Sequence, residues 1–399
     1  MSGPLTRGLL ATLLVAAGLA GAVPARAAPG LEVALQDDAV FVDQYWYGRA
    51  AALDRAQQLD VTWIRANVIW AEALPHGQAA RRKRPRGLRW DFRRWDALID
   101  AAAERGIRVE LTLTGPAPAW ATGNHQIGPN APSIAAWRQF VHRAVAHFRG
   151  RVSRYTIWNE PNYVGWLQPS REAPYLYRRL YLAAWSQIHR VDPSARVLIG
   201  ETSPYAIGHK AWSPLGFLRA ASCVDGRFRR LRGCHGKLVA DGYAQHPYNY
   251  ENPPTYRYPG RDNVTIGTLR RLTAELDHLR RVRALATRNG RPMPLYLTEF
   301  GYFTFGYRRQ PEPRRARYEA QAFRIAQRNP RVRQLLQYQL VEPPPDSSQA
   351  FWKTYLIRFN GHLRETFLTL LSWTRDAAAA GRIARSNGPI ALPAAPRNR

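Results

Sequence analysis

The sequence is poor in sulfur, in lysine and in acidic residues. Its 399 residues include 2 Cys and 2 Met, and 58 basic residues stand against 29 acidic ones, for a formal net charge of +29. Only 4 of the basic residues are Lys, so 54 are Arg. The cysteines, Cys223 and Cys234, are accompanied by a single nearby histidine, His235, which is not the spacing of a metal site. We therefore expect no metal ion and no cofactor.

Long hydrophobic runs are also missing. After residue 27, no stretch reaches the roughly 18 uncharged apolar residues that a membrane span needs. The N-terminus has a basic residue, Arg7, an apolar stretch over residues 8–23, and the small-residue motif Ala25-Arg26-Ala27. This pattern predicts a secretory signal peptide over residues 1–27 and an extracellular protein. A membrane anchor is the alternative, but the apolar stretch is short and ends in a proline.

Export bears on the two cysteines. In an oxidising compartment a single pair of Cys is expected to form a disulfide, and two buried free thiols are the alternative. The chain-entropy model assigns a loop of this length roughly 2–3 kcal/mol of stabilisation. We expect the bond between Cys223 and Cys234 to pin one loop and to carry no chemistry.

No linker, repeat or low-complexity block divides the chain. This favours one domain over residues 28–385, followed by an unfolded tail, SNGPIALPAAPRNR, over residues 386–399. Strand-like runs alternate with amphipathic helical runs. The expected strands are Leu31–Gln36, Thr62–Trp70, Ile107–Thr114, Val152–Trp158, Arg196–Gly200, Leu238–Gln245, Pro294–Phe300 and Arg333–Leu340. The expected helices are Tyr47–Leu59, Trp90–Arg105, Ser133–Phe148, Pro174–Val191, Thr268–Thr287, Arg315–Gln327 and Leu363–Ala380.

This alternation predicts the fold class. Alternating β and α elements argue for a parallel sheet, and eight such units in one domain argue for a closed (β/α)8 TIM barrel. The alternative is a doubly wound sheet. Such a sheet would be expected to carry a glycine-rich loop after an early strand, and neither G-x-G-x-x-G nor G-x-x-x-x-G-K-[ST] is present there.

Two strand ends carry carboxylates. The fourth expected strand runs into Trp-Asn-Glu-Pro-Asn, which contains Asn159 and Glu160, and the seventh runs into Thr-Glu-Phe-Gly, which contains Glu299. In a barrel the carboxyl ends of the strands converge on one face. Two carboxyl groups across a cleft suit glycosidic cleavage, because one donates a proton to the leaving oxygen and the other attacks the anomeric carbon. The alternative is that each glutamate is structural and pairs with an arginine.

The W-N-E-P-N and T-E-F-G segments resemble the two catalytic strands of clan A glycoside hydrolases, in particular the cellulase-like family 5 and family 39. The resemblance extends from about Leu31 to Trp373. It implies a retaining hydrolase that cleaves O-glycosyl bonds of a poly- or oligosaccharide, with Glu160 as acid/base and Glu299 as nucleophile. The alternative function is a non-catalytic glycan-binding barrel. A chain of that kind would be expected to have lost one of these carboxylates.

The resemblance also implies supporting roles. Asn159 would bond the sugar 2-hydroxyl, Tyr248 would donate to the nucleophile, His246 would line the sugar site, and Arg65 would keep Glu299 ionised. Each of the last three has a plain alternative, as a packing or ion-pairing residue of the core.

Aromatic residues near the strand ends are candidates for sugar stacking. Trp120 and Trp166 lie in loops after the third and fourth strands, and Trp70 ends the second, although large aromatics also fill barrel cores. Clan A members often carry a Trp at the end of strand eight, where this chain has Tyr338. Glu201, after the fifth strand, is an additional carboxylate that either binds substrate or pairs with Arg.

The positive charge has two interpretations. Basic clusters occur over residues 81–86, 227–232 and 308–315, in loops expected to follow strands and therefore to lie on the catalytic face. Such a face would suit an acidic glycan or a phosphate-bearing wall polymer, so that a basic protein binding such a polymer is a further alternative function. The other interpretation is an Arg-rich composition with no role in recognition. No nucleic-acid-binding motif accompanies the charge, so we expect no binding to nucleic acid. The expected partner is a carbohydrate, and we expect the protein to be a monomer.

Overall fold

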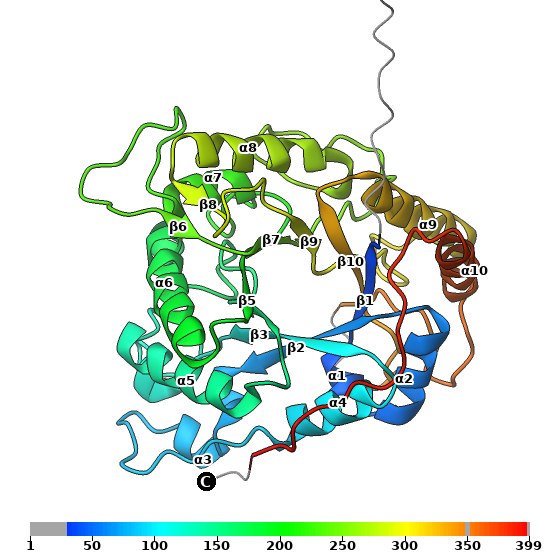
Figure 1. Ribbon diagram of the computed structural model, residues 1–399, viewed down its shortest axis with the longest axis horizontal. Coiled ribbons are helices and arrows are strands. Elements are labelled where there is room, and N and C mark those ends of the chain that lie inside the picture. The colour runs from blue at the N-terminus through cyan, green and yellow to red at the C-terminus, as the bar shows by residue number, and fades with distance from the viewer. Residues whose placement is uncertain (1–29, 348–351, 397–399) are drawn as a thin grey trace, which may run out of the picture.

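The computed structural model describes residues 30–347 and 352–396; the predicted signal peptide lies outside this part of the chain. Eight parallel strands close into a barrel in the order β1-β10-β9-β7-β5-β4-β3-β2, and helices surround it (Figure 1). The predicted (β/α)8 barrel is confirmed. The barrel strands are β1 (Glu32–Gln36), β2 (Trp63–Ile69), β3 (Arg108–Thr114), β4 (Arg154–Ile157), β5 (Arg196–Thr202), β7 (Gly242–Gln245), β9 (Leu295–Leu297) and β10 (Val332–Tyr338).

The helices form the outer layer. Three α-helices have eight or fewer residues: α1 (Asp38–Phe41), α3 (His76–Ala79) and α7 (Pro214–Ala221). The 3-10 turn η1 (Trp70–Ala73) follows β2. The longer ones are α2 (Arg49–Gln58), α4 (Arg93–Ala103), α5 (Ile134–Phe148), α6 (Ala173–Val191), α8 (Leu269–Arg281), α9 (Glu312–Arg328) and α10 (Glu365–Ala379). Further 3-10 turns are η2 (Ala119–Ala121), η3 (Ser170–Glu172) and η4 (Ile266–Thr268). In the described ranges, no helix has both the length and the apolar character that a membrane crossing requires.

The period of two along each strand separates a helix-facing layer from the barrel interior. In β2, Ile64, Ala66 and Val68 pack into the large hydrophobic cluster that joins strands to helices. The alternate residues Trp63 and Arg65 point into the barrel, where Trp63 packs against residues of β1 and β10 and Arg65 makes polar contacts. The barrel interior is therefore partly polar, which allows it to position charged groups.

The amino end of the barrel is closed by a buried arginine. Arg154 of β4 donates to Glu32 at 2.8 and 2.9 Å and to Glu110 at 3.0 Å. Its guanidinium also lies 3.8 Å from the ring centroid of Trp63 and 4.5 Å from that of Tyr296. The paired charges and ring faces compensate for its burial, so the barrel interior is filled by side chains at this end.

The predicted strand over 238–245 is wrong in part. Leu238 and Val239 form β6 (Leu238–Val239), which pairs outside the barrel with β8 (Leu285–Ala286), and only β7 enters the barrel. Gly242 begins β7 where a Cβ atom would lie 2.4 Å from the ring of Tyr296, so the chain enters the barrel at a residue without a side chain. The pairing of β8 also ends the predicted helix 268–287 early, at Arg281.

The predicted position of the cysteine loop is also wrong. The loop follows α7, which the sequence did not reveal, and it lies on the outer flank of the barrel, where Phe228 stacks on His278 of α8. On its other side Arg178 of α6 donates to the carbonyls of His235 and Gly236. The arginines between the cysteines therefore do not face the mouth of the barrel.

The C-terminal segment contacts the barrel as far as Leu392, whereas we expected an unfolded tail from residue 386. Ile383 bridges Leu31 at the start of β1, the Ile390 N–H donates to the Ala103 carbonyl at 2.8 Å, and Leu392 packs against the core. Figure 1 shows this segment, in red, running past α2 and α4. Ile390 and Leu392 therefore hold part of the predicted tail to the barrel.

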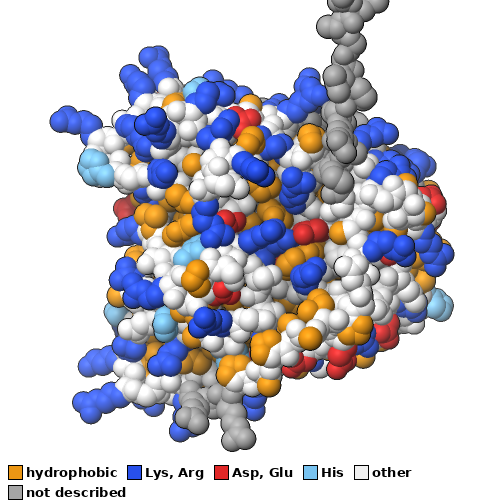
Figure 2. Space-filling model, in the orientation of Figure 1, with side chains coloured by type: hydrophobic (Ala, Val, Ile, Leu, Met, Phe, Trp, Pro, Cys, Tyr) orange, Lys and Arg blue, Asp and Glu red, His pale blue; other side chains and the backbone are white. Residues whose placement is uncertain are grey.

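Charged side chains on this face are dispersed. Figure 2 shows Lys and Arg side chains over the whole visible surface, with few Asp and Glu between them and no single basic stripe. A dispersed distribution is what an Arg-rich composition produces, and it favours the compositional interpretation of the net charge for this face.

The disulfide is confirmed, since Cys223 and Cys234 are bonded with their Cα atoms 5.5 Å apart. Replacing both by Ser should lower the free energy of unfolding by about 2–3 kcal/mol, because the unfolded chain regains the loop entropy. Thermal unfolding of the variant and the parent measures this difference. Thiol titration of the denatured, unreduced parent should find no free thiol; two reactive thiols would contradict the assignment.

Candidate active site

Glu160 is held at the carboxyl end of β4 by bonds to the neighbouring strand. The Trp158 N–H donates to the Leu113 carbonyl at 2.8 Å, and the Asn159 N–H donates to Thr114 Oγ1 at 3.0 Å. Trp158 and Glu160 adopt left-handed backbone conformations, with φ of 66° and 35°. Non-glycine residues persist in this region only where their surroundings hold them, and such residues cluster at functional sites.

Glu299 lies across the mouth, directly after β9. The Thr298 N–H donates to the Gln245 carbonyl at 3.0 Å, which fixes the strand end. Tyr248 Oη donates to Glu299 Oε2 at 3.0 Å, and Arg65 Nη1 donates to Glu299 Oε1 at 2.8 Å. Both oxygens of the carboxylate thus accept a hydrogen bond that fixes its orientation. The structure brings Arg65, Tyr248 and Glu299 together as predicted.

Arg65 is completely buried and makes five hydrogen bonds. Besides Glu299, it donates to Thr112 Oγ1 at 2.8 Å through Nε and to Asn159 Oδ1 at 2.7 Å through Nη2. The remaining bonds go to Gln36 and to Glu201. The charges of Glu201 and Glu299 outweigh the effect of burial and raise the pKa of Arg65 above its ordinary value. The guanidinium therefore carries a permanent charge that orients the side chains around it.

Glu201 takes part in the site as an ion-pairing residue. It sits where the register between β5 and β7 shifts, with φ of 52°, so a bulge in β5 directs its side chain into the barrel. It accepts from Arg65 and, at 3.0 Å, from His246 Nε2. Burial alone would raise the pKa of Glu201, but these two cations lower it below its usual value.

His246 connects three carboxyl groups. Its Nδ1 lies 3.0 Å from Glu160 Oε1 and 3.5 Å from Glu299 Oε2, and its Nε2 faces Glu201. One oxygen of Glu160, one of Glu299 and one ring nitrogen of His246 all lie within 4.8 Å of one another. His246 therefore bridges the two strand-end glutamates and contacts both of them, instead of only lining the site.

The surroundings raise the pKa values of Glu160 and His246. Burial raises the pKa of Glu160 and the charge of Glu299 raises it further, while His246 acts in the opposite direction without cancelling the shift. Burial alone would lower the pKa of His246, but Glu299, Glu160 and Glu201 together raise it to about 10. Near neutral pH the site thus holds a charged His246 between Glu160, whose pKa is raised, and the Glu299 carboxylate, which accepts two hydrogen bonds.

The candidate catalytic pocket, a cavity of about 560 Å³, opens above the two glutamates. Trp166 lines it as a stacking candidate, and Tyr338 lines it at the position where strand eight of clan A members carries Trp. Trp120 is not among the lining residues, and packs edge-on against Trp70 instead, with ring centroids 6.1 Å apart. Position after a strand did not distinguish a lining tryptophan from a core one.

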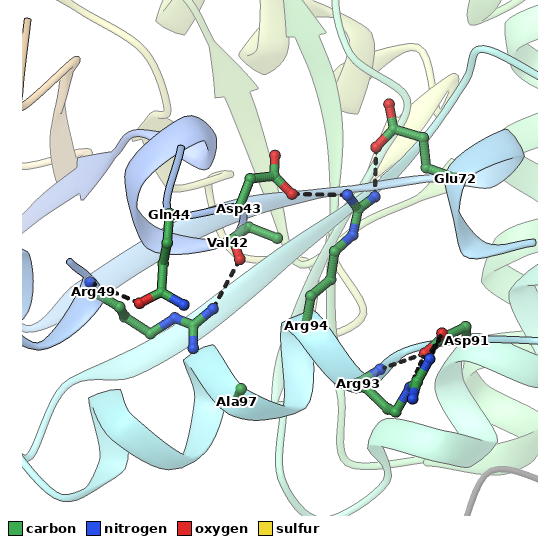
Figure 3. Close-up of a pocket in the computed structure, with 9 residues that line it drawn as sticks. All are labelled: Val42, Asp43, Gln44, Arg49, Glu72, Asp91, Arg93, Arg94 and Ala97. Atoms are coloured by element: carbon green, nitrogen blue, oxygen red, sulfur yellow. Dashed lines mark hydrogen bonds and ion pairs between the residues drawn. The ribbon is translucent and has the colours of Figure 1, made fainter. Parts of the chain in front are cut away.

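Several lining residues were missed. Asp38 follows the end of β1, the same signal that identified the two glutamates, and Asn67 lies in β2 beside it. Trp352 and Tyr163 come from long loops whose sequence gives no sign of their path. Arg94, from the start of α4, lies at the rim between Asp43 and Glu72, as Figure 3 shows; all three residues were also missed.

No protein-family model matches the chain, and no curated protein matches its sequence. Solved structures do match its fold. A family 39 glycoside hydrolase from the gut symbiont Bacteroides cellulosilyticus superposes with a TM-score of 0.61 at 17% identity, over 87% of this chain and 64% of that one. The exo-β-1,4-mannosidase Op5Man5 from an Opitutaceae bacterium gives 0.57 at 15% identity, over 88% and 60%.

A third structure, of family 5 from Bifidobacterium longum in complex with Manβ1-4GlcNAc, gives a TM-score of 0.56 at 12% identity, over 90% of this chain and 80% of that one. The fold is that of clan A glycoside hydrolases. The strand-end motifs predicted this resemblance, which the comparisons confirm for the fold. The chain spans less than two thirds of the length of the first two structures.

The position of His246 predicts a pH-dependent contribution to stability. Its pKa rises from 6.5 to about 10 on folding, so its ion pairs stabilise the fold fully below pH 6.5 and lose this effect as pH rises towards 10. The difference in unfolding midpoint between the parent and His246→Gln should therefore shrink from about pH 6 to pH 10. Thermal unfolding across this range measures it, with exposed His209→Gln as control. A constant difference would mean that folding does not raise the pKa of His246.

Proposed function

We propose that the protein is an exported glycoside hydrolase that cleaves O-glycosyl bonds with retention of configuration. The observation that carries the proposal is the approach of Glu160 and Glu299, whose nearest oxygens lie within 4.8 Å of each other beside His246. Retaining enzymes need carboxyl groups only about 5–5.5 Å apart, whereas inverting enzymes need about 6.5–9.5 Å to admit a water molecule. The disulfide supports export.

The first step forms a glycosyl-enzyme. Glu299 attacks the anomeric carbon, while Glu160 gives its proton to the leaving glycosidic oxygen as the carbon–oxygen bond breaks. Since Glu160 Oε1 faces the Nδ1–H of His246, the proton is carried on Oε2, towards the pocket. Arg65 and Tyr248 hold the attacking carboxylate in position.

The second step releases the sugar. Glu160, now ionised and stabilised by the charge of His246, removes a proton from water, and the resulting hydroxide attacks the anomeric carbon and frees Glu299. Asn159 has its Oδ1 occupied by Arg65, so its Nδ2 is free to donate to a sugar hydroxyl. That bond strengthens in the transition state and favours catalysis.

Two other functions stay open to test. A non-catalytic glycan-binding barrel would be expected to lack one of the carboxylates, yet both are present with their partners. A protein that binds an acidic wall polymer through surface charge would bind independently of Glu160 and with strong dependence on salt.

Two variants separate the roles of the glutamates on an aryl glycoside that the enzyme accepts. Glu299→Gln should abolish turnover, because no covalent intermediate can form. Glu160→Ala should still complete the first step, since an aryl leaving group needs little protonation, and should then stall. Intact-protein mass spectrometry should show the glycosyl-enzyme, and azide should restore turnover with retained configuration.

The control is Glu110→Gln, which removes a buried barrel carboxylate that pairs with Arg154 at the opposite end. It should lower the unfolding temperature but retain activity on the folded enzyme. Full activity of Glu160→Ala on an unactivated substrate would disprove the acid/base role.

A further inference from the structure

The catalytic pocket is acidic although the chain is strongly basic. Five of its lining residues are carboxylic acids: Asp38, Asp43, Glu72, Glu160 and Glu299. Among the described residues that line it, Arg94 is the only cation. The four residues outside the description that precede Trp352 are Ser-Gln-Ala-Phe and add no charge. The local charge therefore has the opposite sign to the net charge of +29.

The cations near the pocket are already paired. Arg94 donates to Asp43 Oδ1 at 2.8 Å and to Glu72 with its other terminal nitrogen (Figure 3). Its guanidinium also lies 4.2 Å from the ring centroid of Trp95. Arg65 and His246, beneath the pocket, contact Glu201 and the two catalytic glutamates. A carboxylate or phosphate on a bound sugar would meet like charges with no free counter-charge, which is unfavourable in a desolvated site.

The basic loops do not alter this balance. No residue of the clusters at 81–86, 227–232 and 308–315 is among the described residues that line the pocket. Arg308 packs 4.1 Å from the ring centroid of Tyr250 and donates to Tyr205 Oη at 3.2 Å, and Arg315 is buried against the Tyr355 carbonyl. Arg308 and Arg315 therefore contact other groups of the protein and do not face the pocket.

Asp38 is prepared to accept a hydrogen bond from a ligand. The Asn67 N–H donates to Asp38 Oδ1 at 2.9 Å, while Gln36 Nε2 and Asn67 Nδ2 donate to Oδ2 at 2.7 and 3.1 Å. Three bonds fix the carboxylate, and an ionised carboxylate accepts about four. The remaining lone pair belongs to Oδ1 on a residue that lines the pocket. Only a donor, such as a hydroxyl or an ammonium group, can use it.

We propose that the catalytic pocket accepts sugars without anionic groups, and that Asp38 is a specificity-determining residue that accepts a hydrogen bond from a sugar hydroxyl or amino group. The proposal rests on the proposed glycoside hydrolase function and names its substrate class. Neutral and amino sugars share the required chemistry, since both present donors. Uronic acids and phosphorylated sugars are excluded.

The first test compares aryl glycosides that differ only at the relevant group: a glucoside, the glucosaminide and the glucuronide, with the xyloside and mannoside as further neutral sugars. For the best neutral or amino sugar, kcat/KM should exceed that for the uronide at least 100-fold. This comparison uses the unaltered protein, so it does not depend on how a variant folds. Preferred hydrolysis of the uronide would overturn the inference and leave the hydrolase function standing.

The second test replaces Asp38 by Asn, which keeps the shape and removes the charge. On the preferred sugar, kcat/KM should fall at least tenfold and the discrimination against the uronide should narrow. A larger loss on the glucosaminide than on the glucoside identifies the amino group as the donor. Asp54→Asn, which removes an exposed carboxylate that pairs with Arg105 on the outer helices, should leave both values unchanged. If Asp38→Asn leaves the ratio of kcat/KM between the preferred sugar and the uronide unchanged, Asp38 does not determine specificity.

Binding separates this inference from the proposed function. If no glycoside is hydrolysed, the function fails, and calorimetry on Glu299→Gln then tests the pocket with cello-, chitosan- and galacturonate oligosaccharides at about 0.15 M salt, where long-range attraction is screened. Binding of a neutral or amino oligosaccharide at least tenfold tighter than the galacturonate would support the inference. Tighter binding of the galacturonate, or no binding of the other two, would overturn it.

Discussion

The site depends on one buried guanidinium. All five hydrogen bonds that an arginine can donate are used by Arg65, and they reach residues of β1, β3 and β5 and the ends of β4 and β9. A buried charge is costly unless it is paired and fully hydrogen-bonded, and here Glu201 and Glu299 provide the pairing. The same bonds fix Asn159 and Glu299 in space. The geometry of the candidate catalytic groups is therefore a consequence of how the barrel accommodates this cation.

The two ends of the barrel each contain a buried arginine, but its surroundings differ between them. At the amino end, Arg154 is enclosed by Glu32, Glu110 and aromatic rings, which fill the barrel interior there. At the carboxyl end, Arg65 is covered by carboxylates that also face a cavity, so its partners remain available to a substrate. Both arginines lie inside the barrel on strands, and only the height along the barrel axis separates a stabilising role from one in the site.

The sequence predicted what short-range patterns determine. The strands follow from alternation and β-branched runs, and Glu160 and Glu299 follow from their positions at strand ends. Loop paths were not predictable in this way: Trp166 reaches the pocket and Trp120 joins the core, although both follow a strand. The eight-residue helix α7 was missed within a loop, and this error moved the cysteine loop from the flank to the mouth. Asp38 had the strand-end signal but no neighbouring motif to single it out.

Composition proved a poor guide to the electrostatics of the site. Net charge is a sum over the whole chain, and its exposed arginines are surrounded by water and screened by salt within about 10 Å. The pocket is governed instead by the few groups that the strand ends bring within hydrogen-bonding distance, where screening is weak. Because burial admits a cation only with its counter-charges, Arg65, His246 and Arg94 gather carboxylates around the mouth. The excess of arginine elsewhere adds positive charge to the surface, but it does not neutralise the carboxylates that line the pocket.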